Sequence, residues 1–166
     1  MKTLILYATK YGATKTLAEK IAAKMPGEAA IQEVSDPAVN LSEYDSIILG
    51  TSIYMGKSRK QMKTFIQNNL PTLLQKRIGL FLSCLQDEND SVSRQFQIAF
   101  PKELRDHALC LAALGGVVDR NRLSKFDGLI MRMVIGVMPD LPKDKRVIST
   151  LAEERIDHLV ALMAEA

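Results

Sequence analysis

The sequence of 166 residues contains only two cysteines and no CxxC pair. Cys84 and Cys110 stand apart from each other and from any histidine cluster, which argues against a disulfide framework and against a zinc site. We expect both to be reduced, buried thiols. No Ser/His/Asp triad, metal-ligand cluster or paired acidic residues are apparent, and His107 and His158 fall on predicted structural elements as packing or surface groups. The sequence therefore identifies no catalytic acid or base and no metal ligand.

Long hydrophobic runs are also missing. No apolar run reaches the roughly 18 to 20 residues that a membrane-spanning helix needs, and the longest candidate, 128–139, contains Arg132. The start of the sequence has neither a basic leader nor a small-residue cleavage site, so we expect a cytoplasmic protein. Low-complexity segments and internal repeats are absent. With 25% charged and 47% hydrophobic residues, the composition is that of a globular protein, and the length suits a single domain, 1–166.

Apolar runs and amphipathic segments alternate along the chain, which predicts a βα repeat. Strands are expected at 3–8, 29–34, 46–50, 78–83 and 107–116. Helices are expected at 14–25, at 62–70 closed by Pro71, at 92–100 ending at Pro101, and from Thr150 onward with Glu153 completing a capping box. Strands that are apolar on both faces, joined by amphipathic helices, favour a doubly wound α/β fold, a parallel sheet with helices on both faces. In such sheets the ligand lies outside the carboxyl ends of the strands.

The loop after the first strand predicts an anion-binding cradle. A helix begins near Ala13, so backbone N–H groups and the positive end of the helix dipole point into one small concavity. Gly12 allows a ligand to approach the backbone closely, and the hydroxyls of Thr9 and Thr14 can donate to phosphate oxygens. An ordinary βα turn with a threonine cap is the alternative. The residues of the predicted cradle are Thr9, Lys10, Tyr11, Gly12, Ala13 and Thr14.

Two further loops complete the predicted ligand site. The loop after the third strand, 50–56, begins and ends with glycine and carries Tyr54, whose ring can stack on a planar heterocycle. A surface tyrosine in a flexible turn is the alternative. The loop after the fourth strand, 84–90, is polar and can close the other side of the site. The ligand-binding residues predicted in these two regions are Thr51, Ser52, Ile53, Tyr54, Gly56, Ser83, Cys84, Leu85 and Asp87.

Other nucleotide-binding folds require signatures that this sequence lacks. A P-loop NTPase needs Gly-Lys-Ser/Thr, whereas Gly12 is followed by Ala13-Thr14. A Rossmann dinucleotide site needs G-x-G-x-x-G, which is absent. A response-regulator receiver carries a phospho-accepting Asp at the end of its third strand, where this chain has Gly50-Thr51. These absences argue against those three kinds of nucleotide or phosphate site, and leave the anion of the cradle to be identified by other features.

The sequence resembles the flavodoxins, which bind flavin mononucleotide (FMN) through a T-x-T-G-x-T-like loop after their first strand. Residues 9–14 are the version of that loop in this chain, with Tyr11 at the position that usually holds a third hydroxyl. The resemblance implies a flavodoxin-like five-stranded sheet of order 2-1-3-4-5, with FMN held by the three loops. No aromatic residue stands between Cys84 and Asp90, where flavodoxins commonly stack a tyrosine, so one face of the flavin is expected to be open.

More specifically, the chain is similar to the flavodoxin-type protoporphyrinogen oxidases, the menaquinone-dependent dehydrogenases of haem synthesis. The similar segments are 1–6, 50–56, and the stretch from Gly115 through Phe126-Asp127 to Ile130-Met131. This resemblance implies an FMN-dependent dehydrogenase that passes electrons from protoporphyrinogen to a quinone. A small electron-transfer flavodoxin that shuttles between redox protein partners is one alternative. A membrane-surface or regulatory module that has lost the cofactor is another.

A basic segment inserted at about 119–146 departs from a plain electron carrier, because flavodoxins that carry electrons are generally acidic. It contains seven basic and four acidic residues and therefore accounts for the whole net charge of +3. Its Met-rich part, 128–139, can lie on an anionic membrane surface as a peripheral contact, or can cover the edge of the sheet as ordinary core.

Basic side chains near the predicted site suit a substrate that carries carboxylates, such as the propionates of a porphyrinogen. The inserted segment supplies the candidates Arg120, Arg122 and Lys125. Each of them is alternatively a solvated surface cation. Further candidates flank the second loop, namely Lys57, Arg59, Lys60 and Lys63. We expect no nucleic-acid partner, and the sequence predicts no oligomeric state.

Overall fold

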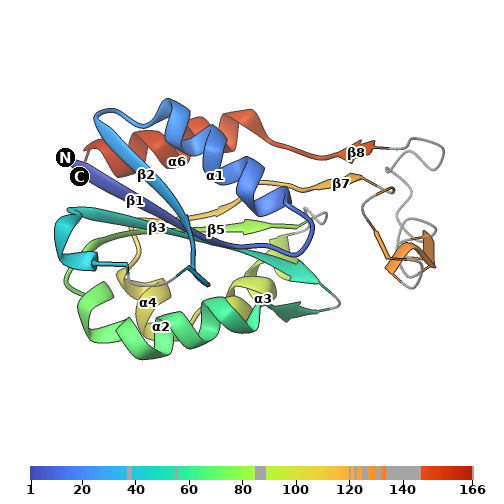
Figure 1. Ribbon diagram of the computed structural model, residues 1–166, viewed down its shortest axis with the longest axis horizontal. Coiled ribbons are helices and arrows are strands. Elements are labelled where there is room, and N and C mark those ends of the chain that lie inside the picture. Colours follow the sequence, from blue (N-terminus) through green and yellow to red (C-terminus); the bar gives the residue numbers. More distant parts are fainter. Residues whose placement is uncertain are drawn as a thin grey trace.

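The computed structural model describes residues 1–36, 39–54, 56–84, 89–119, 121, 123–124, 127–129, 132–133 and 147–165. Its centre is a parallel sheet with the strand order β2-β1-β3-β5-β6 (Figure 1). Counted along the chain without the short β4, this is the predicted order 2-1-3-4-5, so the doubly wound flavodoxin-like topology is confirmed. The parallel strands are β1 (Lys2–Ala8), β2 (Glu28–Glu33), β3 (Ser46–Tyr54), β5 (Arg77–Ser83) and β6 (Cys110–Ala113).

Helices cover both faces of this sheet (Figure 1). On one face lie α1 (Ala13–Lys24) and α6 (Glu153–Glu165), and on the other lie α2 (Lys60–Leu73), α3 (Asn89–Ala99) and α4 (Lys102–His107). Successive residues of a strand point to opposite faces, so Leu4 and Leu6 pack under α2, whereas Ile5 packs under α1. The two cores formed in this way explain why the strands read as continuous apolar runs.

The third strand is longer than predicted. Instead of ending at Gly50 and opening into a loop, β3 continues to Tyr54 and turns back to pair antiparallel with β4 (Lys57–Ser58). The parallel ladders to β1 and β5 end at Thr51 and Ser52, so the backbone groups beyond them need new partners, which β4 provides. Tyr54 therefore stands on a strand, and Met55 lies outside the described residues.

The predicted strand at 107–116 is also wrong in its bounds. Only Cys110–Ala113 form β6, and the predicted first residue of the strand, His107, is instead the last residue of α4, a short helix that the sequence did not predict. Leu104 is the one residue of α4 that is fully buried. The segment therefore lacks the repeating apolar residues from which a helix can be predicted. The cysteines agree with the prediction, since both are buried thiols and burial raises the pKa of Cys110.

Two helix boundaries differ from those predicted. Pro71 does not close α2 but lies in its last turn, and the helix continues to Leu73, whose side chain is fully buried. The final helix begins at Glu153, and Thr150 does not form the predicted capping box. Its hydroxyl instead accepts a hydrogen bond of 3.0 Å from the Gly116 amide, while Glu153 pairs with Lys20 and Lys24 of α1.

A small antiparallel ladder, which the sequence did not predict, joins β7 (Val117–Asp119) to β8 (Val147–Ser149). Asp119 pairs with Val147 in this ladder, so the two ends of the basic segment meet at a neck. The neck extends from the carboxyl edge of the sheet, beside the ligand site predicted from the loops (Figure 1). No helix in the described part of the chain is long and apolar enough to cross a membrane.

Gly50 is required by close packing between β3 and β5. A Cβ atom at this position would lie 1.9 Å from Cζ of the fully buried Phe81 ring. We expect Gly50→Ala to lower the free energy of unfolding by about 1–3 kcal/mol because the core becomes overpacked. Urea denaturation followed by circular dichroism measures this loss. Gly128→Ala is the matched control, because a Cβ there meets no atom of the described residues within 4 Å. Equal midpoints for the two variants would contradict the packing.

Candidate functional site

The first turn of α1 is the core of the candidate site. Gly12 stands at the N-cap with φ of 90°, and no side chain among the described residues caps the helix. The first turn contains no acidic residue, so the positive end of the dipole is not neutralised from within the helix. Thr9 stabilises the turn by accepting a hydrogen bond of 3.0 Å from the Gly12 amide. The helix end therefore presents N–H groups without a side-chain acceptor, as the predicted anion cradle requires.

Unpartnered hydroxyls gather beside this turn. Within the described part of the chain, the buried oxygen atoms Thr14 Oγ1, Thr51 Oγ1 and Ser52 Oγ have no hydrogen-bond partner. Thr14 and Thr51 are fully buried, and leaving such a group unsatisfied costs roughly 1–3 kcal/mol. Native proteins rarely tolerate several such atoms close together unless water or a ligand completes them. A phosphate group, which accepts hydrogen bonds from hydroxyls and amides, fits this donor set.

A small hollow of about 90 Å³ lies at the carboxyl ends of β1, β3 and β5. It brings together residues from all three predicted loops. Its lining consists of Thr9, Lys10, Tyr11, Ala13, Ser52, Ile53, Tyr54, Ser83, Cys84, Gly116, Val117 and Leu123. The last three were not predicted, because they follow β6 and become neighbours of the site only through the sheet order.

The other predicted residues are placed differently. Gly12, Thr14 and Thr51 border the site through backbone or buried hydroxyl groups and do not line the hollow. Gly56 is exposed in the turn between β3 and β4, with φ of 68°. Several predicted residues lie outside the described part of the chain, namely Leu85, Asp87, Arg120, Arg122 and Lys125.

Asp127 organises the side chains around the hollow, and the sequence analysis missed it as a site residue. Its carboxylate is 6% exposed and accepts hydrogen bonds from the hydroxyls of Tyr11 and Tyr54. The Lys10 ammonium group lies 2.8 Å from the same carboxylate. The Asp127 amide is held in turn by Ser124 Oγ at 3.1 Å. The available signal was Phe126-Asp127 within the segment that carries the resemblance. The side-chain partners of Asp127 lie 73 to 117 residues away in sequence, so no local pattern could reveal them.

Lys10 also contacts the two tyrosine rings. Its Nζ atom lies 4.0 Å from the ring centroid of Tyr54 and 5.1 Å from that of Tyr11, within the range of cation–π attraction. The two rings meet edge to face, with centroids 6.4 Å apart. The interpretation of Tyr54 as a surface residue in a flexible turn is therefore wrong. The ring is fixed by a strand, a carboxylate, a cation and a second aromatic ring.

The hollow is large enough for a phosphate-sized group but not for a planar heterocycle. Small-molecule sites usually occupy about 300–1,000 Å³, well above the observed 90 Å³. The contacts that Tyr11, Tyr54 and Lys10 make with Asp127 occupy the space beside the cradle. A ring-bearing ligand must separate at least some of these contacts in order to enter.

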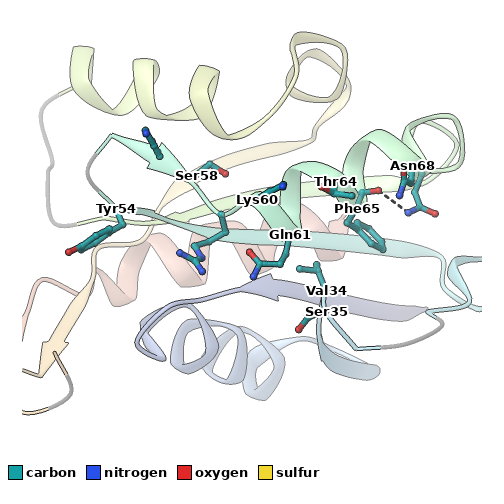
Figure 2. Close-up of a pocket in the computed structure, with 12 residues that line it drawn as sticks. Val34, Ser35, Tyr54, Ser58, Lys60, Gln61, Thr64, Phe65 and Asn68 are labelled. Carbon is teal, nitrogen blue, oxygen red and sulfur yellow. Dashed lines mark hydrogen bonds between the residues drawn. The ribbon is translucent and has the colours of Figure 1, made fainter. Parts of the chain in front are cut away.

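A larger groove of about 860 Å³ lies beside Tyr54, along the β3–β4 hairpin and α2 (Figure 2). Three of the cations considered from the sequence, Lys57, Arg59 and Lys60, line this groove, and Lys63 does not. In the basic segment, Leu129 and Met133 are 58% and 68% exposed, so these two side chains do not form core. Among the described residues, no group of three or more His, Cys, Asp or Glu side chains could hold a metal ion.

Comparison with known proteins was consistent with this architecture. A family model described as "Flavodoxin domain" matches residues 4–143. No curated protein gives a significant sequence match.

Oxidised flavodoxin 1 from Bacillus cereus is 22% identical, with 69% of this chain and 82% of that chain covered and a TM-score of 0.49. A flavoprotein from Lactobacillus acidophilus, solved in complex with FMN, is 19% identical, with coverage of 69% and 91% and a TM-score of 0.46. A Fusobacterium nucleatum flavodoxin bound to FMN is 24% identical, with coverage of 52% and 54% and a TM-score of 0.40.

The Asp127 contacts should contribute measurably to stability. Asp127→Ala removes the acceptor for two hydroxyls and an ammonium group, and we expect the free energy of unfolding to fall by about 1.5–3 kcal/mol. Asp106→Ala is the control, because its pair with Lys102 is exposed and worth less than about 1 kcal/mol. Urea denaturation compares the two variants. A loss at Asp127 no larger than at Asp106 would show that the cluster does not stabilise the fold.

Proposed function

The chain belongs to the flavodoxin domain family, and on that premise we propose that it is an FMN-binding oxidoreductase. The observation that carries the proposal is the uncapped start of α1 beside the buried, unpartnered hydroxyl of Thr14. FMN ends in a single phosphate group, which matches one small anion cradle rather than the paired phosphate sites of dinucleotides.

The residues of the cradle have different roles in binding FMN. The backbone amides after Gly12 and the hydroxyl of Thr14 bind the phosphate, while Thr9 keeps the turn in shape through the Gly12 amide. Tyr54, at the end of β3, borders the space for the ring. Once bound, FMN supplies the redox chemistry, and the protein supplies binding, orientation and the electrostatic environment.

Entry of the flavin ring competes with the contacts that Asp127 makes with its neighbours. Tyr11, Tyr54 and Lys10 all contact this one carboxylate. Binding therefore exchanges internal contacts for contacts with the cofactor, and the net affinity is the difference between the two sets. Lys10 is then available as a cation beside the phosphate or the ring.

For the reaction itself, we propose electron transfer from a carboxylate-bearing organic substrate to a quinone. Protoporphyrinogen is the substrate suggested by the resemblance of segments 1–6 and 50–56 and of the stretch from Gly115 to Met131. The concentration of net positive charge in 119–146 supports an anionic partner. The exposed side chains of Leu129 and Met133 next to Arg132 support peripheral contact with an anionic membrane surface, where a quinone is reached.

The role of Thr14 in phosphate binding is directly testable. Thr14→Val removes a hydroxyl that has no partner among the described residues, so the fold is retained. We expect FMN to bind roughly 10- to 100-fold more weakly, because a hydrogen bond to a charged group is lost. Riboflavin, which lacks the phosphate, should bind equally to both proteins. Quenching of flavin fluorescence measures both ligands.

Thr72→Val, at an exposed position of α2, is the matched control and should leave FMN affinity unchanged. If the native chain bound riboflavin as tightly as FMN, the phosphate cradle would be wrong. If it bound neither flavin, the family fold would be present without its cofactor.

The proposed reaction is tested with FMN-loaded protein under anaerobic conditions. With menadione as electron acceptor, we expect protoporphyrinogen to be converted to protoporphyrin. The fluorescence of the porphyrin product measures the rate. The rate should fall to the uncatalysed background when FMN is omitted, because the proposed electron transfer runs through the cofactor. An FMN-loaded protein that forms no porphyrin but is rapidly reduced by a flavodoxin reductase would instead be an electron-transfer flavodoxin.

A further inference from the structure

The groove beside Tyr54 is separate from the cradle and is large enough for an organic ligand. It runs from Tyr54 at one end to Asn68 at the other, with Val34 and Ser35, which follow β2, across from Gln61 and Phe65 of α2 (Figure 2). Its volume of about 860 Å³ falls in the usual range of small-molecule sites, about 300–1,000 Å³.

The charged side chains that line this groove, among the described residues, are all cationic. Lys57, Arg59 and Lys60 line it, and none of its twelve lining residues is acidic. Within the described part of the chain, none of these three cations forms an ion pair. Cations of one sign in a concave surface raise the local concentration of anions. The groove therefore suits an anionic ligand.

The start of α2 adds to the positive electrostatic potential of the groove. Arg59 is the N-cap residue, the helix has no side-chain cap among the described residues, and its first turn contains no acidic residue. Arg59 Nε and Ser58 Oγ are buried donors without a partner in the part of the chain that is described. Arginine binds carboxylates in a planar, two-pronged geometry, so the Arg59 guanidinium group at a groove beside a helix N-terminus favours a carboxylate.

The remaining lining is apolar or neutral. Phe65 and Val34 both line the groove and are partly buried against the core, and Tyr54 stands at one end (Figure 2). The amide of Asn69 is already used, since it donates to the carbonyl of Phe65 at 2.8 Å. An apolar floor with cations at one end is complementary to an amphipathic ligand.

From these features we propose that the groove binds an organic anion that has a flat apolar body and at least one carboxylate. The body lies against Phe65 and Val34, and the carboxylate is held by Arg59 and Lys60. Because Tyr54 lines both the groove and the small hollow, the bound anion adjoins the flavin cradle. Only the position of the anion next to a bound flavin rests on the proposed function. Binding of the anion itself requires no flavin.

Pyrenebutyrate is a suitable probe, because it joins one carboxylate to a flat, fluorescent apolar ring. We expect the native protein to bind it in one-to-one stoichiometry, and pyrenebutanol, the neutral analogue, at least tenfold more weakly. Arg59→Gln and Lys60→Gln should each weaken pyrenebutyrate binding about tenfold, because a charge-assisted hydrogen bond is lost, and should leave pyrenebutanol binding unchanged. Fluorescence titration measures both ligands on the native protein and on the two variants.

Lys63→Gln is the matched control, because Lys63 is an exposed cation of the same helix that does not line the groove. It should bind pyrenebutyrate as the native protein does. Equal binding of the acid and the alcohol, or an equal loss in all three variants, would overturn the proposal. A parallel FMN titration keeps the two proposals apart, since loss of FMN binding with pyrenebutyrate binding intact contradicts only the flavin site.

Discussion

Burial of both faces of a parallel sheet is the constraint on which the rest of this molecule depends. Leu4 and Leu6 point to one helical layer and Ile5 to the other, so β1 can satisfy its backbone groups only through its neighbours in the sheet. Parallel strands with right-handed crossovers bring their carboxyl ends to one edge. Polar loops that are far apart in the sequence must therefore meet there, and the unpartnered hydroxyls are found at that edge.

The carboxylate of Asp127 connects the side chains at that edge of the sheet. Asp127 reaches across from the basic segment to Tyr11 and Lys10 of the first loop and to Tyr54 of the third strand. The contact joins a segment beyond the neck of β7 and β8 to the start of the chain. The donors that hold Asp127 therefore also border the cradle, so the same three side chains connect the basic segment to the candidate site.

Tyr54 separates two surfaces of different size and character. On the side of the hollow it contacts Asp127 and Lys10, in a space that fits a phosphate-sized group. On the side of the groove it faces a larger, apolar space with cations at the start of α2. The extension of β3 into a hairpin produces this arrangement, since a strand fixes the direction of a side chain in a way that a loop does not.

The sequence alone determined the features that depend on local burial and local turn chemistry. Continuous apolar runs such as 46–50 identified the parallel sheet, and Gly12 between Thr9 and Thr14 predicted an anion cradle at the start of the first helix. Tertiary structure decided what depends on partners distant in sequence: the continuation of β3 to Tyr54, the pairing of β7 with β8, and the hydrogen bonds of Asp127. The physical reason is that hydrophobic periodicity reports which face of an element is buried. It carries no information about which distant backbone or carboxylate will satisfy a given polar group.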